Sequence, residues 1–124
     1  FKKYSSYGGL IIEATGLGHL PINKSDNFTL ENEKIYLEIK KLAKKIPVVI
    51  TTQCVFGRIN MNIYSPGRKL KETGVLGDYC DMTSETAYIK LAWLLSNYKK
   101  EEVRSLIDKD FRGEISKRLT EEFI

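Results

Sequence analysis

Residues 47–52 read PVVITT, and this short stretch sets the expected fold class. The five residues after Pro47 are all β-branched, a composition that favours a strand buried on both faces. Residues 29–46 lie upstream and carry an apolar stripe at helical spacing, with Thr29 at the expected N-cap. The stripe consists of Ile35, Ile39, Leu42 and Ile46. A helix is therefore expected to lead, through Pro47, into a buried strand.

A second strand is expected before this helix. Residues 9–15 read GLIIEAT, which predicts a short buried strand in which Glu13 is either a buried acid or paired with a base from a loop. Strand, helix and strand in this order predict a βαβ unit with parallel strands. Because parallel strands end at the same sheet edge, residues 15–20 and 52–58 are expected to lie close together, where α/β proteins bind ligands. The expected fold class is α/β, a small parallel sheet of βαβ type flanked by helices.

The rest of the chain adds one uncertain segment and several helices. Residues 58–64 alternate apolar and polar side chains, which predicts a half-exposed strand or an extended loop. Short amphipathic patterns predict helices at 66–73 and 100–109, with a short helical tail after Gly113. Residues 83–95 predict a helix that is apolar on nearly every side, so it is either central to the core or covered by a partner.

Composition limits the class of protein. The chain has 124 residues, of which 42% are hydrophobic and 29% charged, so it is expected to form one domain over 1–124 and not a disordered tail or a disulfide scaffold. The apolar runs are too short for a membrane span and no signal peptide is visible, so a cytoplasmic protein without a membrane partner is expected. The net charge of +4 is mild, and the lysines at 40–45 fit a solvated helix end better than a phosphate-binding patch. Lysine outnumbers arginine 15 to 5, which points weakly to a thermophile or an AT-rich genome.

Few residues in this chain could carry chemistry. Cys54 and Cys80 are expected to be reduced thiols, with Cys54 as a small core residue. His19 is the single histidine, and neither a Cys–His pair nor a zinc site is well supported by one histidine and two cysteines. Residues 16–19 read GLGH, a tight turn that lacks the third glycine of a dinucleotide-binding loop. We therefore expect no catalytic residue, metal or cofactor in this chain, which looks like half of an active site.

Five ordered motifs carry a resemblance to a known family. They read EATGLGHLP at 13–21, PVVITTQCVFGRINMNIY at 47–64, GRKL at 67–70, DMTSETAYIKL at 81–91 and GEI at 113–115. In this order and spacing they resemble the C-terminal domain of the asparaginase family. The resemblance implies a two-domain amidohydrolase whose N-terminal domain holds the threonine nucleophiles and a Thr-Asp-Lys set. None of those catalytic motifs occurs in residues 1–124, so this chain alone is expected to be inactive.

The resemblance also implies where a substrate would lie. Members of the family work as dimers in which the C-terminal domain of one protomer edges the substrate pocket of the other. At the position of His19 simple asparaginases usually carry asparagine, an amide that approaches the neighbouring pocket. The residues expected at this pocket edge are His19, Gln53, Arg58, Asn60 and Tyr64.

Within the family, His19 and residues 58–64 look most like the D subunit of the archaeal glutamyl-tRNA(Gln) amidotransferases. That branch implies release of ammonia from glutamine, with its own N-terminal domain, a second copy, the amidotransferase E subunit and tRNA as partners. Any ATP would be used by the E subunit, which activates the glutamate on the tRNA. Three alternatives stay open: a stand-alone archaeal L-asparaginase, a non-catalytic assembly domain, and a nucleotide-binding α/β domain.

Overall fold

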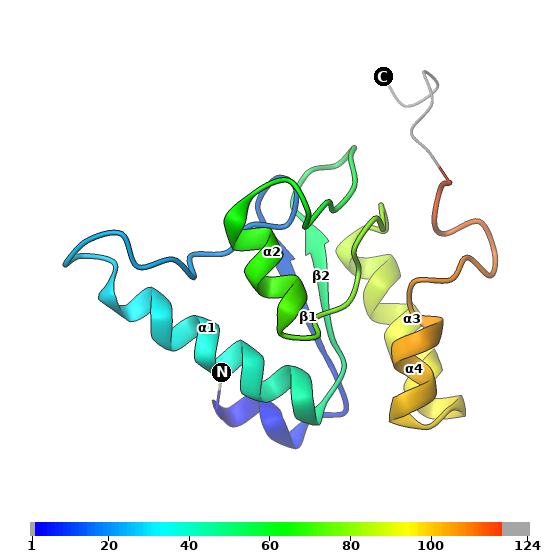
Figure 1. The fold of residues 1–124 in the computed structure, drawn as a ribbon. Coiled ribbons are helices and arrows are strands. Elements are labelled where there is room, and N and C mark those ends of the chain that lie inside the picture. The colour runs from blue at the N-terminus through cyan, green and yellow to red at the C-terminus, as the bar shows by residue number, and fades with distance from the viewer. Residues whose placement is uncertain (1, 118–124) are drawn as a thin grey trace.

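Two parallel strands form the centre of the computed structural model, which describes residues 2–117 (Figure 1). Strand β1 (Leu10–Ala14) pairs with strand β2 (Val48–Thr52) so that Leu10 lies opposite Val48 and Ala14 opposite Thr52. Helix α1 (Leu30–Lys45) connects them. The predicted βαβ unit, its parallel sheet and the α/β class are confirmed.

Helices cover both faces of this sheet (Figure 1). Besides α1, the structure contains the 3-10 helix η1 (Lys2–Ser6) and the helices α2 (Ser65–Glu72), α3 (Ser84–Asn97) and α4 (Lys100–Leu106). In Figure 1, α1 and α2 lie on one side of the strands, and α3 and α4 lie on the other.

The alternation of side chains along β2 explains these two helix layers. Successive residues of a strand point to opposite faces, and all five residues of β2 are buried. Val48 and Ile50 belong to the core under α1 and α2, whereas Val49 packs with Leu91 and Val103 from α3 and α4. A strand with a helix layer on each face is buried along its whole length, and the β-branched composition of β2 predicts such burial.

Residues 75–77 extend the sheet on the other side of β2. The Leu76 N–H donates to the Val48 carbonyl at 2.8 Å, and the Ile50 N–H donates to the Leu76 carbonyl at 2.9 Å. Gly77 follows with φ of 100°, and a side chain there would collide with the carbonyl oxygen of Ile50. Glycine therefore allows the chain to pass close to β2 on its way to α3.

Helix α3 buries one face and exposes the other, although its sequence is apolar on nearly every side. The predicted cap is confirmed, because the Thr83 hydroxyl accepts a hydrogen bond from the Thr86 N–H. One face, including Leu91 and Leu94, is buried in the core. The opposite face is exposed and carries Tyr88, Ile89 and Trp93. The expectation of a partner therefore concerns this outer face only.

The structure corrects several local predictions. Residues 58–64 form a loop with a turn at Met61 and Asn62, so the first of the two expected forms, a strand, is wrong. The Thr29 hydroxyl does not cap α1, because it accepts from the N–H groups of the preceding turn instead. Helix α4 ends at Leu106, earlier than predicted. Of the expected helical tail, residues 114–117 are irregular and residues 118–124 lie outside the described residues.

Within residues 2–117, no helix has the length and apolarity needed to cross a bilayer.

Candidate functional site

The loops that follow β1 and β2 meet at one edge of the sheet, as predicted. We call residues 15–21 the first loop and residues 53–64 the second loop. The Asn60 N–H in the second loop donates to the Leu17 carbonyl in the first at 3.0 Å. Figure 1 shows both loops beyond the tips of the two strand arrows. This is the edge at which an open α/β sheet offers a ligand site.

The first loop is held tightly against the end of β2. The Thr52 hydroxyl donates to the Gly16 carbonyl at 2.6 Å. Gly18 has φ of 105°, and a Cβ atom there would lie 3.1 Å from the Cγ2 atom of Ile59. Both the backbone angle and the packing therefore require a glycine at this point of the turn.

His19 and Tyr64 meet across the two loops. Their rings are arranged edge to face, with 5.0 Å between the centroids and 62° between the planes. The backbone of His19 is fixed by Thr15, whose N–H donates to the His19 carbonyl at 3.1 Å while its own carbonyl accepts from the His19 N–H at 2.9 Å. The imidazole is partly buried, whereas the phenol of Tyr64 is about half exposed. This contact joins the first loop to the end of the second loop near the sheet edge.

The other three predicted pocket-edge residues have different surroundings. The Oδ1 atom of Asn60 accepts from the Asn62 N–H at 3.2 Å. Gln53 is exposed at the start of the second loop. The guanidinium of Arg58 donates to the carbonyls of Ser116 at 3.1 Å and Lys117 at 3.3 Å, so it binds the C-terminal segment. The structure thus brings His19 and Tyr64 together and joins the Asn60 backbone to Leu17 of the first loop, and the role of all five residues stays a prediction.

A polar cluster beside the second loop was not predicted from the sequence. Asp78 lies at its centre and accepts from the Met61 N–H at 2.9 Å, the Asn62 side-chain amide at 3.2 Å and the Lys71 ammonium at 2.7 Å. Burial opposes ionisation of Asp78, but the hydrogen bond from Lys71, with those from Met61 and Asn62, lowers the pKa of the carboxyl below its usual value. The adjacent Tyr79 has φ of 64°, a left-handed conformation that is rare for a bulky residue.

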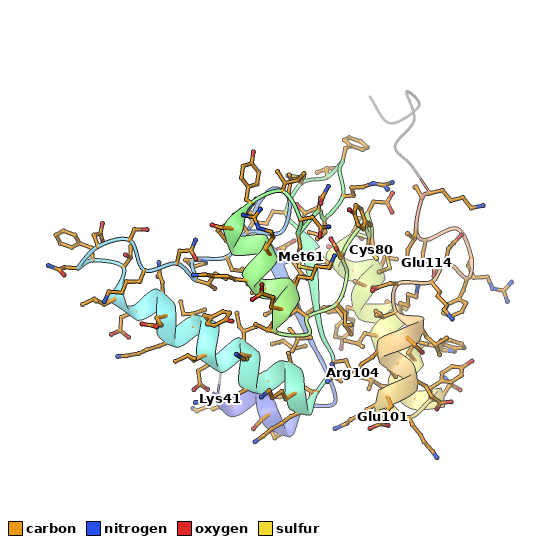
Figure 2. The ribbon with its side chains drawn as sticks, viewed as in Figure 1. Lys41, Met61, Cys80, Glu101, Arg104 and Glu114 are labelled. Atoms are coloured by element: carbon orange, nitrogen blue, oxygen red, sulfur yellow. The ribbon has the colours of Figure 1, made fainter. Side chains whose placement is uncertain are left out.

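Glu114, in the GEI motif, forms an ion pair with a lysine of α3. The Lys90 ammonium lies 2.7 Å from Glu114 Oε1, and the side chains of both residues are largely buried. Burial would raise the pKa of Glu114, but hydrogen bonds from Lys90 and from the N–H groups of Arg112 and Phe111 lower it to about 2. Figure 2 labels Glu114 at the side of α3 that faces away from the sheet. This pair explains why α3 carries a lysine among largely apolar residues.

Glu13 is exposed, so the first of its two expected alternatives, a buried acid, is wrong. Its Oε1 atom accepts from the Ser84 hydroxyl at 3.0 Å, and Ser84 in turn lies 2.7 Å from the Thr51 hydroxyl. These contacts join the ends of both strands to the first residue of α3. A carboxylate beside a helix N-terminus is favourable for the helix, so this contact has a structural explanation.

Both cysteines are free, and the prediction that Cys54 is a small core residue is wrong. Cys54 is exposed because the chain leaves the sheet at Thr52 and turns into the second loop. Cys80 is buried, and its pKa is raised to about 12 by burial and by the nearby carboxylate of Asp108. A thiol with so high a pKa stays protonated at neutral pH and is a poor nucleophile. No group of three or more His, Cys, Asp or Glu side chains within residues 2–117 is arranged to hold a metal.

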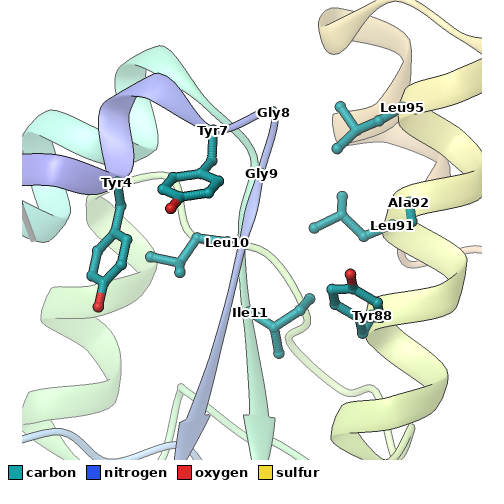
Figure 3. Close-up of a pocket in the computed structure, with 10 residues that line it drawn as sticks. All are labelled: Tyr4, Tyr7, Gly8, Gly9, Leu10, Ile11, Tyr88, Leu91, Ala92 and Leu95. Atoms are coloured by element: carbon teal, nitrogen blue, oxygen red, sulfur yellow. The ribbon is translucent and has the colours of Figure 1, made fainter.

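An open pocket of about 420 Å³ lies between the N-terminal segment and α3 (Figure 3). Tyr4 and Tyr7 come from one side, and Tyr88, Leu91 and Leu95 come from the other. We call it the tyrosine pocket. Its phenols are substantially exposed, and the outer face of α3 continues the apolar surface through Ile89 and Trp93. The tyrosines near the start of the chain and the apolar outer face of α3 therefore form one surface.

Comparison with known proteins assigns the family. The family model described as the Glutaminase/Asparaginase C-terminal domain matches residues 2–107. The D subunit of glutamyl-tRNA(Gln) amidotransferase from Methanobrevibacter smithii is 41% identical over 114 residues, which cover 90% of this chain and 23% of that protein. Its counterpart from Pyrococcus abyssi is 41% identical over 112 residues, or 89% of this chain and 23% of that protein.

Solved structures support the same assignment. The L-asparaginase from Thermococcus kodakarensis aligns with a TM-score of 0.73 and 30% identity, over 88% of this chain and 31% of that one. L-asparaginase I from Vibrio cholerae aligns with a TM-score of 0.72 and 32% identity, over 88% of this chain and 30% of that one. The chain spans less than a quarter of the length of the two curated relatives quoted above. Because the family match covers the sheet, both loops and all the helices, the chain belongs to the asparaginase C-terminal domain family.

Proposed function

We propose that this chain is the C-terminal domain of a two-domain amidohydrolase that releases ammonia from glutamine for tRNA-dependent synthesis of glutaminyl-tRNA(Gln). The observation that carries the proposal is the 41% identity to two archaeal amidotransferase D subunits over nine-tenths of the chain. The domain supplies the edge of a substrate pocket and an interface, while the nucleophile comes from an N-terminal domain.

The chemistry of residues 2–117 supports this division of labour. Hydrolysis of an amide by covalent catalysis needs an activated nucleophile with a base in reach. The Cys80 thiol is buried and held protonated, and the hydroxyl of Thr52 is engaged with the Gly16 carbonyl. The imidazole of His19 lies against Tyr64 at the sheet edge, where it can donate or accept a hydrogen bond to a bound amide.

The tyrosine pocket and the outer face of α3 are the proposed interface. A contiguous apolar surface with several aromatic side chains is typical of a surface that another domain or protomer covers. We propose the N-terminal domain of the same protein as the first occupant and a second copy as the dimer partner. The further partners that we propose are tRNA and the amidotransferase E subunit, which would use ATP. We propose the cytoplasm as the location of this assembly.

The decisive experiment compares substrates on the complete protein. Ammonia release is measured with glutamine and with asparagine, each with and without the E subunit, ATP and glutamyl-tRNA(Gln). The proposal predicts glutamine as the better substrate and formation of glutaminyl-tRNA(Gln) only when all components are present. Release of ammonia mainly from asparagine, independent of tRNA, would instead identify a stand-alone L-asparaginase.

That second candidate has its own support, because both solved structures quoted above are L-asparaginases. The nearer sequence relatives are amidotransferase subunits, at 41% identity against 30% and 32% for those asparaginases. A complete protein that hydrolyses neither amide would point to the remaining alternative, a domain that serves assembly only.

A further inference from the structure

The turn at residues 77–80 holds the second loop from outside the candidate site. The Ile59 N–H donates to the Cys80 carbonyl at 2.9 Å, and the Tyr79 N–H donates to the Ile59 carbonyl at 3.0 Å. Ile59 thus bonds to two successive residues of the turn, the two-against-one arrangement of a β-bulge. It fixes the backbone immediately before Asn60.

Asp78 adds further hydrogen bonds to the second loop, on the residues that follow Asn60. One carboxylate oxygen accepts from the Met61 N–H at 2.9 Å, and the other accepts from the Asn62 side-chain amide at 3.2 Å. The Asn62 backbone N–H donates to the Oδ1 atom of Asn60 at 3.2 Å. An unbroken sequence of hydrogen bonds therefore leads from Asp78 to the side chain of a predicted pocket-edge residue.

Helix α2 supports the second loop from the opposite side. Met61 is fully buried, and a Cβ atom on Gly67 of α2 would lie only 2.8 Å from the Met61 carbonyl oxygen. Figure 2 shows Met61 beside α2, with Cys80 on the side toward α3. Lys71, near the end of α2, lies 2.7 Å from Asp78 and also donates to Asn62 at 2.8 Å. The loop is thus held between α2 and the carboxylate of Asp78.

Tyr79 provides a second observation at the same place. Its left-handed backbone, with φ of 64°, is strained for a residue with a bulky side chain. Such strain persists only where the surrounding contacts determine it, and it concentrates at functional sites. The Tyr79 hydroxyl accepts from the same Asn62 amide that Asp78 binds, at 3.0 Å.

We propose that Asp78 is a positioning residue for the substrate-pocket edge, because it fixes the second loop so that Asn60 and Tyr64 face the amide substrate. Asp78 itself does not touch substrate. It acts through Met61 and Asn62, and the strained turn at Tyr79 brings its carboxylate into place. This inference rests on the proposed function as far as it concerns an amide substrate.

The test uses the complete enzyme and a pair of matched variants. Asp78→Ala removes a carboxylate that accepts one backbone N–H of the second loop. Asp26→Ala removes a carboxylate that accepts the N–H groups of Phe28 and Thr29 at 2.9 Å each, in a turn away from both loops. We expect Asp78→Ala to raise the KM for the amide roughly tenfold, the factor given by one charge-assisted hydrogen bond, with kcat changed less than about twofold. Asp26→Ala is expected to leave both constants unchanged.

A double-mutant cycle with Asn60→Ala separates positioning from general destabilisation. If Asp78 acts through Asn60, Asp78→Ala raises KM much less in the Asn60→Ala background than in the wild-type background. Fully additive effects of the two substitutions would overturn the proposal. An unchanged KM in Asp78→Ala would do the same.

Amide hydrogen exchange supplies a readout that does not depend on activity. Exchange across residues 58–64 is expected to increase in Asp78→Ala and to stay unchanged in Asp26→Ala. Should Asp78→Ala fail to fold, Tyr79→Phe removes only the hydroxyl that accepts from Asn62, and a smaller increase in the same segment is expected. Unchanged exchange in these variants overturns the positioning role. A complete protein that releases no ammonia, yet shows the expected exchange, overturns the proposed function alone.

Discussion

The ring of His19 packs edge to face against the ring of Tyr64, with 5.0 Å between their centroids. The two residues belong to different loops, and each loop follows a different strand of the parallel sheet. Their contact therefore joins the two halves of the edge where the substrate is proposed to lie. It also means that a substitution at either residue changes the surroundings of the other.

The substitution His19→Ala is expected to weaken substrate handling in the complete enzyme with little effect on folding. The side chain is only partly buried, so the thermal midpoint should stay nearly unchanged. Loss of one or two hydrogen bonds to the substrate should lower kcat/KM by a factor that corresponds to about 1–3 kcal/mol of transition-state stabilisation. Asp26→Ala, in a turn away from both loops, serves as the control and is expected to leave the kinetics unchanged. Unaltered kinetics with a large fall in stability would assign His19 to the core.

Local composition was sufficient to predict the frame of the fold. The β-branched run at 48–52 becomes the buried strand because it lies between two helix layers, and the apolar stripe of α1 faces the core. Gly16 and Gly18 adopt positive φ values in the turn predicted for them. These features depend on residues that are neighbours in the sequence, so the local residue pattern is enough to predict them.

The features that the sequence did not reveal depend on tertiary contacts. Cys54 follows an apolar strand but lies beyond the last paired residue, and sequence periodicity does not show where pairing stops. Arg58 meets the carbonyls of Ser116 and Lys117, nearly sixty residues away, so its partners could not be read from its surroundings in the chain. Asp78 occupies a polar stretch that looks like an ordinary loop, although a Gly-Asp pair next to an apolar segment is a recognisable turn signal.

The tyrosine pocket should be needed for association with the rest of the protein. We expect the 124-residue chain to release no ammonia by itself, and a mixture of this chain with the proposed N-terminal domain to be active. Tyr88→Ser removes an aromatic side chain from the pocket and should weaken the complex by about 1.5–3 kcal/mol, measured by titration calorimetry. Phe28→Ser is the matched control, because Phe28 is 97% exposed and lies outside the pocket. Equal losses in both variants, or none in either, would contradict the proposed interface.

The two cysteines should differ sharply in reactivity. Cys54 is exposed, whereas burial and the carboxylate of Asp108 raise the pKa of Cys80 to about 12. Because the thiolate is the reactive form, iodoacetamide at neutral pH should label Cys54 in the native chain and Cys80 only after unfolding. Mass spectrometry of the labelled peptides measures this directly. The variant Cys54→Ser should take up no label while folded, and native labelling of Cys80 would show that its site opens readily.

The ion pair of Lys90 and Glu114 should make stability depend on acid pH. Hydrogen bonds from Lys90 and two backbone N–H groups outweigh burial and lower the pKa of Glu114 from 4.5 to about 2. A carboxyl with a lowered pKa in the folded state stabilises the fold above its unfolded pKa, and this contribution disappears as the pH falls through the folded pKa. We therefore expect the free energy of unfolding to decline between about pH 4.5 and 2, in part because of Glu114.

The substitution Glu114→Gln isolates this contribution. At pH 7 it leaves the largely buried ammonium of Lys90 without its carboxylate, so the loss of stability should be about 3 kcal/mol or more. Near pH 2 the wild-type carboxyl is itself becoming protonated, so the difference between variant and wild type should shrink. Urea unfolding of the complete protein at several pH values measures both quantities. The double variant Glu114→Gln with Lys90→Met removes the unpaired charge and should recover part of the loss at pH 7. If the difference between Glu114→Gln and wild type stays constant from pH 7 to pH 2, ionisation of Glu114 does not stabilise the fold.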